Sequence, residues 1–312
     1  MPRPEIVRFD DSHLDRAAEL LAERHARHRT AEPLLPAAAD FRGGLEQLWA
    51  KEGASGVFAE GGYLIGVPRD DSWGPNVWIE AAGHAVQEPE LVRDLYAAAA
   101  ADWVEQGRTR HYALVPAGDR ELVDAWFRLG FGQQQAYGVL ALPVNAEVAV
   151  PEGFEIRAPR PEEVEELIDV DLALPQHQRS SPVFSPLKLR TRDESRAEWL
   201  ATIDGDEEKI FIGARGEHPV ACWALVSIDQ SRDFRDLFRP NRASYLSFAS
   251  TLPEARGSGI GVALTNASFA WAAEQGYDAM VTDWRVTNLL ASRFWPRRGF
   301  RTAFLRLYRS IP

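Results

Sequence analysis

The sequence predicts an α/β protein that contains two copies of one strand-and-helix architecture. Residues 87–131 align without a gap over residues 256–300, at a constant separation of 169 positions. Apolar and glycine positions coincide at this single separation, which chance similarity does not reproduce. The length of 312 residues also suits two domains better than one.

The two copies share a helix face and a closing Gly-Phe pair. The aligned positions are Leu91 with Ile260, Leu95 with Leu264, Ala98 with Ala267, Glu105-Gln106-Gly107 with Glu274-Gln275-Gly276, Asp119 with Asn288, Trp126 with Trp295, and Gly130-Phe131 with Gly299-Phe300. Near the start of each copy the separation is 149, where Ile6-Val7-Arg8 aligns with Glu155-Ile156-Arg157. Prolines and a glycine between Pro143 and Gly153 mark the joint. We therefore expect one domain at residues 1–145 and another at 152–312.

A glycine-rich loop in the second copy indicates a ligand. Residues 256–261 read Arg-Gly-Ser-Gly-Ile-Gly, between a strand-like run at 245–251 and a helix that begins near Ile260. Leu264, Ala267 and Trp271 continue one face of that helix, which Gly276 ends. Glycines leave backbone N–H groups uncovered, and a helix N-terminus adds partial positive charge. The loop therefore predicts a phosphate-binding site.

Spacing separates the kinds of phosphate loop. A P-loop needs a Gly-Lys-Ser/Thr triplet, which the chain lacks. A dinucleotide loop needs Gly-x-Gly-x-x-Gly and an acid that closes the next strand, whereas Asp278 opens the next strand here. A coenzyme A loop and an ordinary glycine-rich turn both remain open from the loop alone. After it, residues 277–284 read as a strand and residues 288–298 as a helix.

Residues 252–261 resemble the acyl-CoA-binding motif of the GNAT superfamily of N-acyltransferases, and the run from Asn288 to Gly299-Phe300 resembles its second signature. The resemblance extends from about Phe154 to the C-terminus. It implies two tandem GNAT-like domains of the α+β kind, each a mixed, mostly antiparallel twisted sheet flanked by helices. It also implies acetyl-CoA as the cofactor and transfer of acetyl to a primary amine of a small molecule, by direct attack in the C-terminal domain.

The same resemblance implies a coenzyme site in the second copy. Its residues are Ala249, Ser250, Thr251, Leu252, Arg256, Gly257, Ser258, Gly259, Ile260, Gly261, Asn288, Phe294 and Trp295. In the first copy, Glu88 and Glu90 align with Gly257 and Gly259. Two carboxylates beside a pyrophosphate would repel it, so we expect the first domain to be degenerate and to lack a pyrophosphate loop.

The catalytic groups are less clearly marked. Many GNAT members carry a tyrosine general acid where this chain has Trp295, and an indole N–H is too weak an acid to replace it. Ser292, one turn after Asn288, and Tyr308, on the last predicted strand, are the candidates for that acid. Asp283 lies in an otherwise apolar strand and is the candidate base, with structural ion pairing as the alternative.

An acceptor pocket is expected from the segment 174–192, which reads as an irregular loop containing His177. We interpret His177 as a polar loop residue. Trp199, Trp223 and Trp284 are candidates for aromatic surface around an acceptor, with core packing as the alternative.

Composition limits the partners and the compartment. The net charge of −11 argues against nucleic acid, and no run is apolar and long enough to span a bilayer. Cys222 is the only cysteine, so no intramolecular disulfide and no cysteine metal cluster is expected, and a reducing cytoplasm is the simplest location. The expected partner is a small-molecule amine, and the expected state is a monomer or homodimer.

Three alternatives stay open from the sequence. The missing tyrosine favours a non-catalytic acyl-CoA-binding sensor or regulatory module. The acidic charge suits cationic acceptors, as in aminoglycoside resistance. The tandem arrangement with a degenerate first half is also similar to that of the mycothiol synthases.

Overall fold

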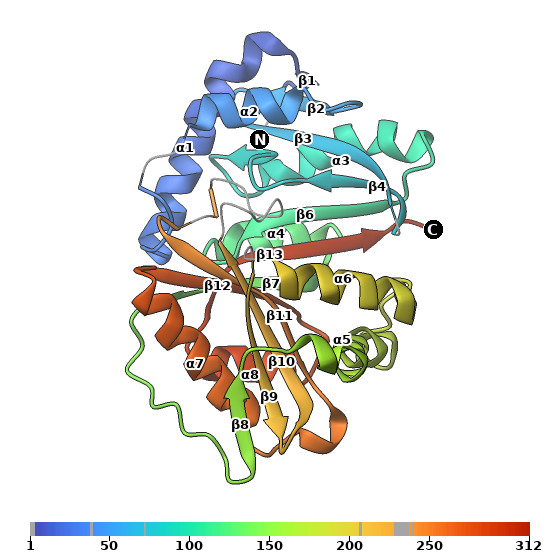
Figure 1. Ribbon diagram of the computed structural model, residues 1–312. Coiled ribbons are helices and arrows are strands. Elements are labelled where there is room, and N and C mark those ends of the chain that lie inside the picture. The colour runs from blue at the N-terminus through green and yellow to red at the C-terminus, as the bar shows by residue number, and fades with distance from the viewer. Residues whose placement is uncertain (1–3, 38–39, 72, 206–207, 228–236, 239) are drawn as a thin grey trace.

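The computed structural model of the protein describes residues 4–37, 40–71, 73–205, 208–227, 237–238 and 240–312. In these residues the strands form one 13-stranded sheet with helices on both faces (Figure 1). The strands are β1 (Val7–Arg8), β2 (Ser55–Ala59), β3 (Gly62–Asp71), β4 (Gly74–Ile79), β5 (His84–Val86), β6 (Arg110–Pro116), β7 (Gly132–Ala141), β8 (Phe154–Arg157), β9 (Glu208–Arg215), β10 (His218–Ser227), β11 (Ala243–Thr251), β12 (Ala279–Arg285) and β13 (Arg301–Ser310). The α-helices are α1 (Leu14–Ala31), α2 (Phe41–Trp49), α3 (Leu91–Glu105), α4 (Arg120–Arg128), α5 (Val164–Arg179), α6 (Arg192–Asp204), α7 (Ile260–Glu274) and α8 (Ala291–Arg297).

The elements repeat as the sequence predicts. Helices α3 and α7, strands β6 and β12, and strands β7 and β13 each begin and end 169 residues apart. Only the pairs β4–β6 and β11–β12 are parallel among the described strands; the others are antiparallel. The predicted mixed, mostly antiparallel sheet flanked by helices is therefore confirmed.

The two copies exchange their last strands, which the sequence did not predict. The sheet order is β1-β2-β3-β4-β6-β13-β7-β12-β11-β10-β9-β8, and β5 pairs with β3. Strand β13, from the end of the chain, pairs with β6 of the first copy, and β7 of the first copy pairs with β12 of the second. Strands β13 and β7 pair with each other in the centre. The two expected sheets are thus continuous.

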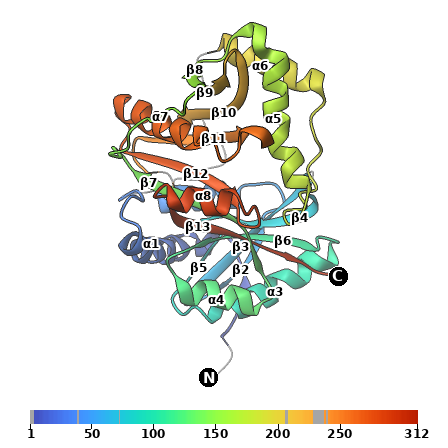
Figure 2. The same cartoon turned by 90° about the horizontal axis from the view of Figure 1, so that it is seen from below.

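Helices of both copies cover one face of this sheet. Buried side chains of α3, α4, α7 and α8 form a single apolar cluster that runs across both copies. On the opposite face, α1 and α2 cover the first copy, and α5 and α6 cover the second, each with its own cluster (Figure 2). The central strands therefore have a region between these two helix pairs where polar side chains can reach a cavity.

The predicted strands at 245–251 and 277–284 agree with β11 and β12 to within two residues at each end, and two other predicted elements differ more. Helix α7 begins at Ile260 as expected, whereas α8 begins at Ala291, because Asn288 lies before it and its Oδ1 accepts the N–H groups of Leu290 and Ala291. The expectation of an irregular loop from residue 174 is wrong for its first part, since α5 continues through Pro175 to Arg179. Pro175 has no N–H to donate to the preceding turn, which is a cost that α5 tolerates near its C-terminal end.

No helix in the described part of the chain is long and apolar enough to cross a membrane.

Candidate active site

The glycine loop presents free backbone donors. Gly257 and Gly259 have φ values of 78° and 95°, a left-handed conformation that favours glycine. Among the described residues, no acceptor bonds the backbone N–H groups of Gly257, Gly259 or Gly261. A Cβ added at Gly257 would meet nothing within 4 Å. The loop therefore offers an open set of N–H groups at the start of α7, which is the arrangement that binds a pyrophosphate.

Two parallel strands diverge next to this loop. Strand β11 pairs with β12 only from Ala243 to Leu246, and its register with β10 shifts at the bulge beside Ala224. From residue 247 to Thr251 the edge of β11 that faces β12 pairs with none of the described strands. Its N–H and C=O groups on that edge are available to a ligand that enters between the strands.

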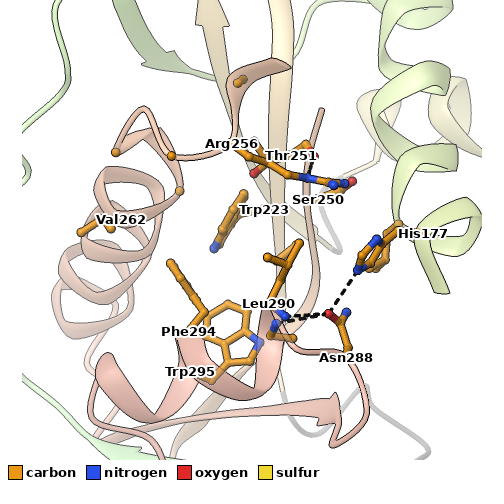
Figure 3. A pocket seen from close by; sticks show the side chains of 17 residues that line it. His177, Trp223, Ser250, Thr251, Arg256, Val262, Asn288, Leu290, Phe294 and Trp295 are labelled. Atoms are coloured by element: carbon orange, nitrogen blue, oxygen red, sulfur yellow. Dashed lines mark hydrogen bonds between the residues drawn. The ribbon is translucent and has the colours of Figure 1, made fainter. Parts of the chain in front are cut away.

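A cavity of about 400 Å³ occupies this divergence; we call it the coenzyme cavity. Figure 3 shows its wall, with Trp223 and Phe294 from opposite sides and Arg256 beside Thr251. Ten predicted coenzyme residues line it, namely Ala249, Ser250, Thr251, Arg256, Gly257, Gly259, Gly261, Asn288, Phe294 and Trp295. Leu252 lies in a neighbouring pocket, Ile260 is buried against Gly213, and the Ser258 hydroxyl bonds Ala255 O.

His177 reaches this cavity from α5. Its Nε2 lies 3.3 Å from Asn288 Oδ1, and the carbonyl oxygen must accept, so Nε2 is the donor (Figure 3). Asn288 is buried and fixes both the start of α8 and the histidine ring. Interpreting His177 as a polar loop residue missed this contact, because the helix that carries it was read as a loop.

A second cavity, of about 350 Å³, adjoins the first; we call it the acceptor cavity. Leu174, Ala249, Asn288, Ala291 and Trp295 line both cavities. Residues of strands β7, β11, β12 and β13 form much of the remaining wall, and Trp73 joins them from the first copy, directly before β4. Gln178 of α5 and Leu187 after it complete the wall, so the segment 174–192 does line this cavity. The two cavities are therefore joined along a shared wall.

Asp283 lies in the acceptor cavity with two polar neighbours. Its Oδ1 accepts the Tyr245 hydroxyl at 2.5 Å, and its Oδ2 accepts the Gln135 amide. Gln135 in turn accepts from Arg306. The carboxylate is therefore held in place at the cavity wall.

The two predicted acids lie outside these cavities. Tyr308 faces Tyr112, with ring centroids 5.0 Å apart, on the strand pair β13–β6. Ser292 lies on the first turn of α8, and its N–H bonds Asn288 O. Among the described residues, neither lines the coenzyme cavity or the acceptor cavity. Of the three tryptophans, Trp223 lines the coenzyme cavity and Trp284 the acceptor cavity, whereas Trp199 belongs to the cluster under α5.

The corresponding loop of the first copy is closed by acidic side chains. Glu88 and Glu90 line a pocket there with Glu121, Asp124, Arg120 and Arg128, and Glu90 pairs with Arg128 at 2.8 Å. Val92, which stands in the place of Gly261, is fully buried.

Sequence reasoning missed the contribution of the exchanged strands. Gln135, Arg285 and Arg306 line the acceptor cavity, but only the pairing of β7 with both β12 and β13 brings them together. Their only signal in the sequence was the presence of polar residues within strand-like runs.

Residues 174–300 match the family model described as "Acetyltransferase (GNAT) family". No curated protein matches the chain significantly in sequence.

Solved structures of the same fold cover the whole chain. A GCN5-related N-acetyltransferase from Sphaerobacter thermophilus is 14% identical with a TM-score of 0.59, over 98% of this chain and 95% of that one. A glucosamine N-acetyltransferase region of a fungal multi-domain β-N-acetylglucosaminidase is 15% identical with a TM-score of 0.59, over 99% of this chain and 38% of that one. A tandem GNAT protein from the clavulanic acid biosynthesis pathway is 16% identical with a TM-score of 0.50, over 99% and 98%. These similarities establish the fold of the tandem arrangement.

Proposed function

We propose that the protein transfers acetyl from acetyl-CoA to a primary amine of a small molecule, and that transfer takes place in the C-terminal copy, where residues 174–300 match the acetyltransferase (GNAT) family model. The observation that carries this proposal is the uncovered set of loop N–H groups opening into a cavity between diverging strands. The division into domains 1–145 and 152–312 is part of the proposal.

The loop and the strand edge fit the coenzyme. The N–H groups of Gly257, Gly259 and Gly261 suit a pyrophosphate at the N-terminus of α7. Arg256 bonds Thr251 O at 3.2 Å, which holds its guanidinium at the cavity wall, where it can add a charge-assisted contact to phosphate. The free edge of β11 suits the pantetheine arm.

Acetyl-CoA supplies a thioester whose carbonyl carbon can accept an amine. In the reaction, a nitrogen–carbon bond forms, the carbon–sulfur bond breaks, the amine proton passes to a base, and the thiolate sulfur receives a proton. Asp283 is the base, because its carboxylate is fixed in the acceptor cavity. Free N–H groups of β11 stabilise the negative charge that develops on the carbonyl oxygen.

His177 is our proposed source of the thiolate proton. It replaces Ser292 and Tyr308 in this role because it lines the coenzyme cavity beside Asn288, where the two cavities meet. Trp295, in the position of the family's tyrosine, closes the wall of both cavities with its ring.

Release of coenzyme A thiol, followed with a thiol reagent, tests the function. Burial of Cys222 raises the pKa of its thiol and shields it, so the folded protein contributes little background. We expect thiol release that depends on added amine and matches the acetylated amine found by mass spectrometry. Acetyl-CoA binding without amine-dependent release from any amine would instead support the non-catalytic sensor.

A further inference from the structure

The acceptor cavity contains a guanidinium that makes no ion pair with any residue that the structure describes. Arg285 lines this cavity, and its guanidinium has no hydrogen bond or ion pair to any residue that the structure describes. The guanidinium carbon lies 4.6 Å from the centroid of the Trp73 ring. Burial, and then the nearby Arg306, lower the pKa of Arg285 to about 10, and the group still carries a full charge at neutral pH.

A second guanidinium lies close by. Arg306 donates to Gln135, lies 3.5 Å from the Tyr137 hydroxyl and lies over the Trp78 ring at 5.3 Å. Gln135 is in register with Arg285 on one neighbouring strand and with Arg306 on the other, so the two cations flank it. Gln135 also separates Arg306 from the Asp283 carboxylate.

The described lining of the acceptor cavity therefore carries two guanidinium groups and one carboxylate. This positive balance contrasts with the net charge of −11 for the whole chain. A half-buried cation without a counter-ion is unfavourable unless a ligand supplies the anion. A guanidinium that is stacked on an aromatic ring keeps its N–H edges free for a carboxylate or phosphate. The same balance is unfavourable for a polycationic acceptor.

We propose that the acceptor is a small amine that also carries an anionic group, a carboxylate or a phosphate, bound by Arg285 with support from Arg306. This inference rests on the proposed function for the identity of the reacting amine. Asp283 and Arg285 are two positions apart on one strand face, which places them roughly 7 Å apart. The amine then lies at Asp283 and the anion at Arg285.

Matched acceptors test this specificity. Amino acids and ω-amino acids are compared with their carboxamides, and amino-sugar phosphates with the unphosphorylated amino sugars. We expect the anionic member of at least one pair to have a kcat/KM higher by about tenfold or more, from one or two charge-assisted hydrogen bonds. Which pair shows the preference distinguishes a carboxylate from a phosphate.

Substitutions test whether Arg285 causes the preference for anionic acceptors. Arg285→Gln should reduce the anionic-to-neutral ratio to about one through KM, with the KM for acetyl-CoA unchanged, and Arg285→Lys should restore part of it. Arg309→Gln is the control, because it also removes one positive charge. Arg309 lies on β13, stacks on Tyr96 and is outside the described lining of the cavity. Equal use of neutral amines by the wild type, or an unchanged ratio in Arg285→Gln, would overturn the inference.

A binding measurement keeps the inference testable without turnover. Calorimetric titration of the anionic and neutral amines into the complex with unacylated coenzyme A reports acceptor binding directly. Anionic binding that Arg285→Gln removes would support the anion site even if no amine is acetylated, which would count against the proposed function alone. No preference for the anionic member in this titration would overturn the anion site.

Discussion

At the scale of single residues, the proposed chemistry depends on a few side chains that the fold fixes in the walls of two joined cavities. Asp283 is held by Tyr245 and Gln135, and His177 by Asn288. Each of these contacts joins residues that are distant in sequence. Substitutions at these positions should therefore separate chemistry from binding.

Asp283→Asn should lower kcat by about a hundredfold or more, because the amide cannot take the amine proton. Acetyl-CoA binding should not change, since the side chain lies in the acceptor cavity. Steady-state kinetics and calorimetry check the two parts. Asp278→Asn, at an exposed position just before β12, is the control and should behave as wild type. An undiminished kcat would contradict the role of Asp283 as the base.

His177→Gln should lower kcat by about tenfold to a hundredfold with little change in the KM for acetyl-CoA, because glutamine can keep the bond to Asn288 but cannot act as a general acid. Tyr308→Phe and Ser292→Ala should have small effects, since neither side chain lines the described cavities. A larger loss of kcat in Tyr308→Phe than in His177→Gln would contradict this assignment and identify Tyr308 as the general acid.

At the scale of elements, the site is made by a loop and by the divergence of two strands. The loop could be identified from the sequence, because glycine spacing and helix periodicity are local. The divergence of β11 from β12 depends on how far the two strands pair, which the sequence did not predict. The capping of α8 by Asn288 is local, but it was missed because the helix was expected to begin at residue 288.

Gly257 offers a matched test of the loop. Gly257→Ala and Gly257→Glu each place a side chain on a left-handed backbone, which costs about 1 to 2 kcal/mol in both variants. The added Cβ meets no neighbouring atom within 4 Å in either variant. Only the glutamate adds the charge that Glu88 carries in the first copy. We expect acetyl-CoA affinity to fall about tenfold or more further in Gly257→Glu than in Gly257→Ala, measured by calorimetry. Equal losses of acetyl-CoA affinity in the two variants would mean that backbone strain alone weakens binding and that the added charge has no effect.

At the scale of the whole molecule, the exchange of β7 and β13 makes the two copies mutually dependent. The repeat predicted the elements of each copy but not their partners, because a strand's apolar alternation does not identify the strand beside it. Arg301 on β13 pairs with Glu32 after α1, and His28 of α1 donates to Ala303 O on β13. The acceptor cavity depends on the same exchange through Gln135 and Arg306.

Separate expression tests this dependence. Fragments 1–145 and 152–312 should each lack cooperative thermal unfolding as monomers, because β6 and β12 lose their exchanged partners. Co-expressed fragments should copurify and bind acetyl-CoA. A monomeric 152–312 fragment that unfolds cooperatively and binds acetyl-CoA as the full chain does would show that the exchange is dispensable.

Stability should also fall in acid. Burial lowers the pKa of both His28 and His84 to about 3. Below about pH 6.5 these histidines bind protons in the unfolded chain but stay neutral in the folded protein. The free energy of unfolding therefore falls as pH falls from about 6.5 toward 3, by about 1.4 kcal/mol per pH unit for each ring. Urea unfolding at several pH values measures the slope. His28→Gln should reduce it and the exposed His218→Gln should not; equal slopes in all three proteins would contradict this.

The most direct test of the central claim is a crystal structure of the full chain with coenzyme A. We expect one coenzyme per chain, with its pyrophosphate on the N–H groups of Gly257, Gly259 and Gly261 and its thiol between β11 and β12, near Asn288 and His177. A coenzyme bound at the Glu88–Glu90 loop, or outside the divergence of β11 and β12, would contradict it.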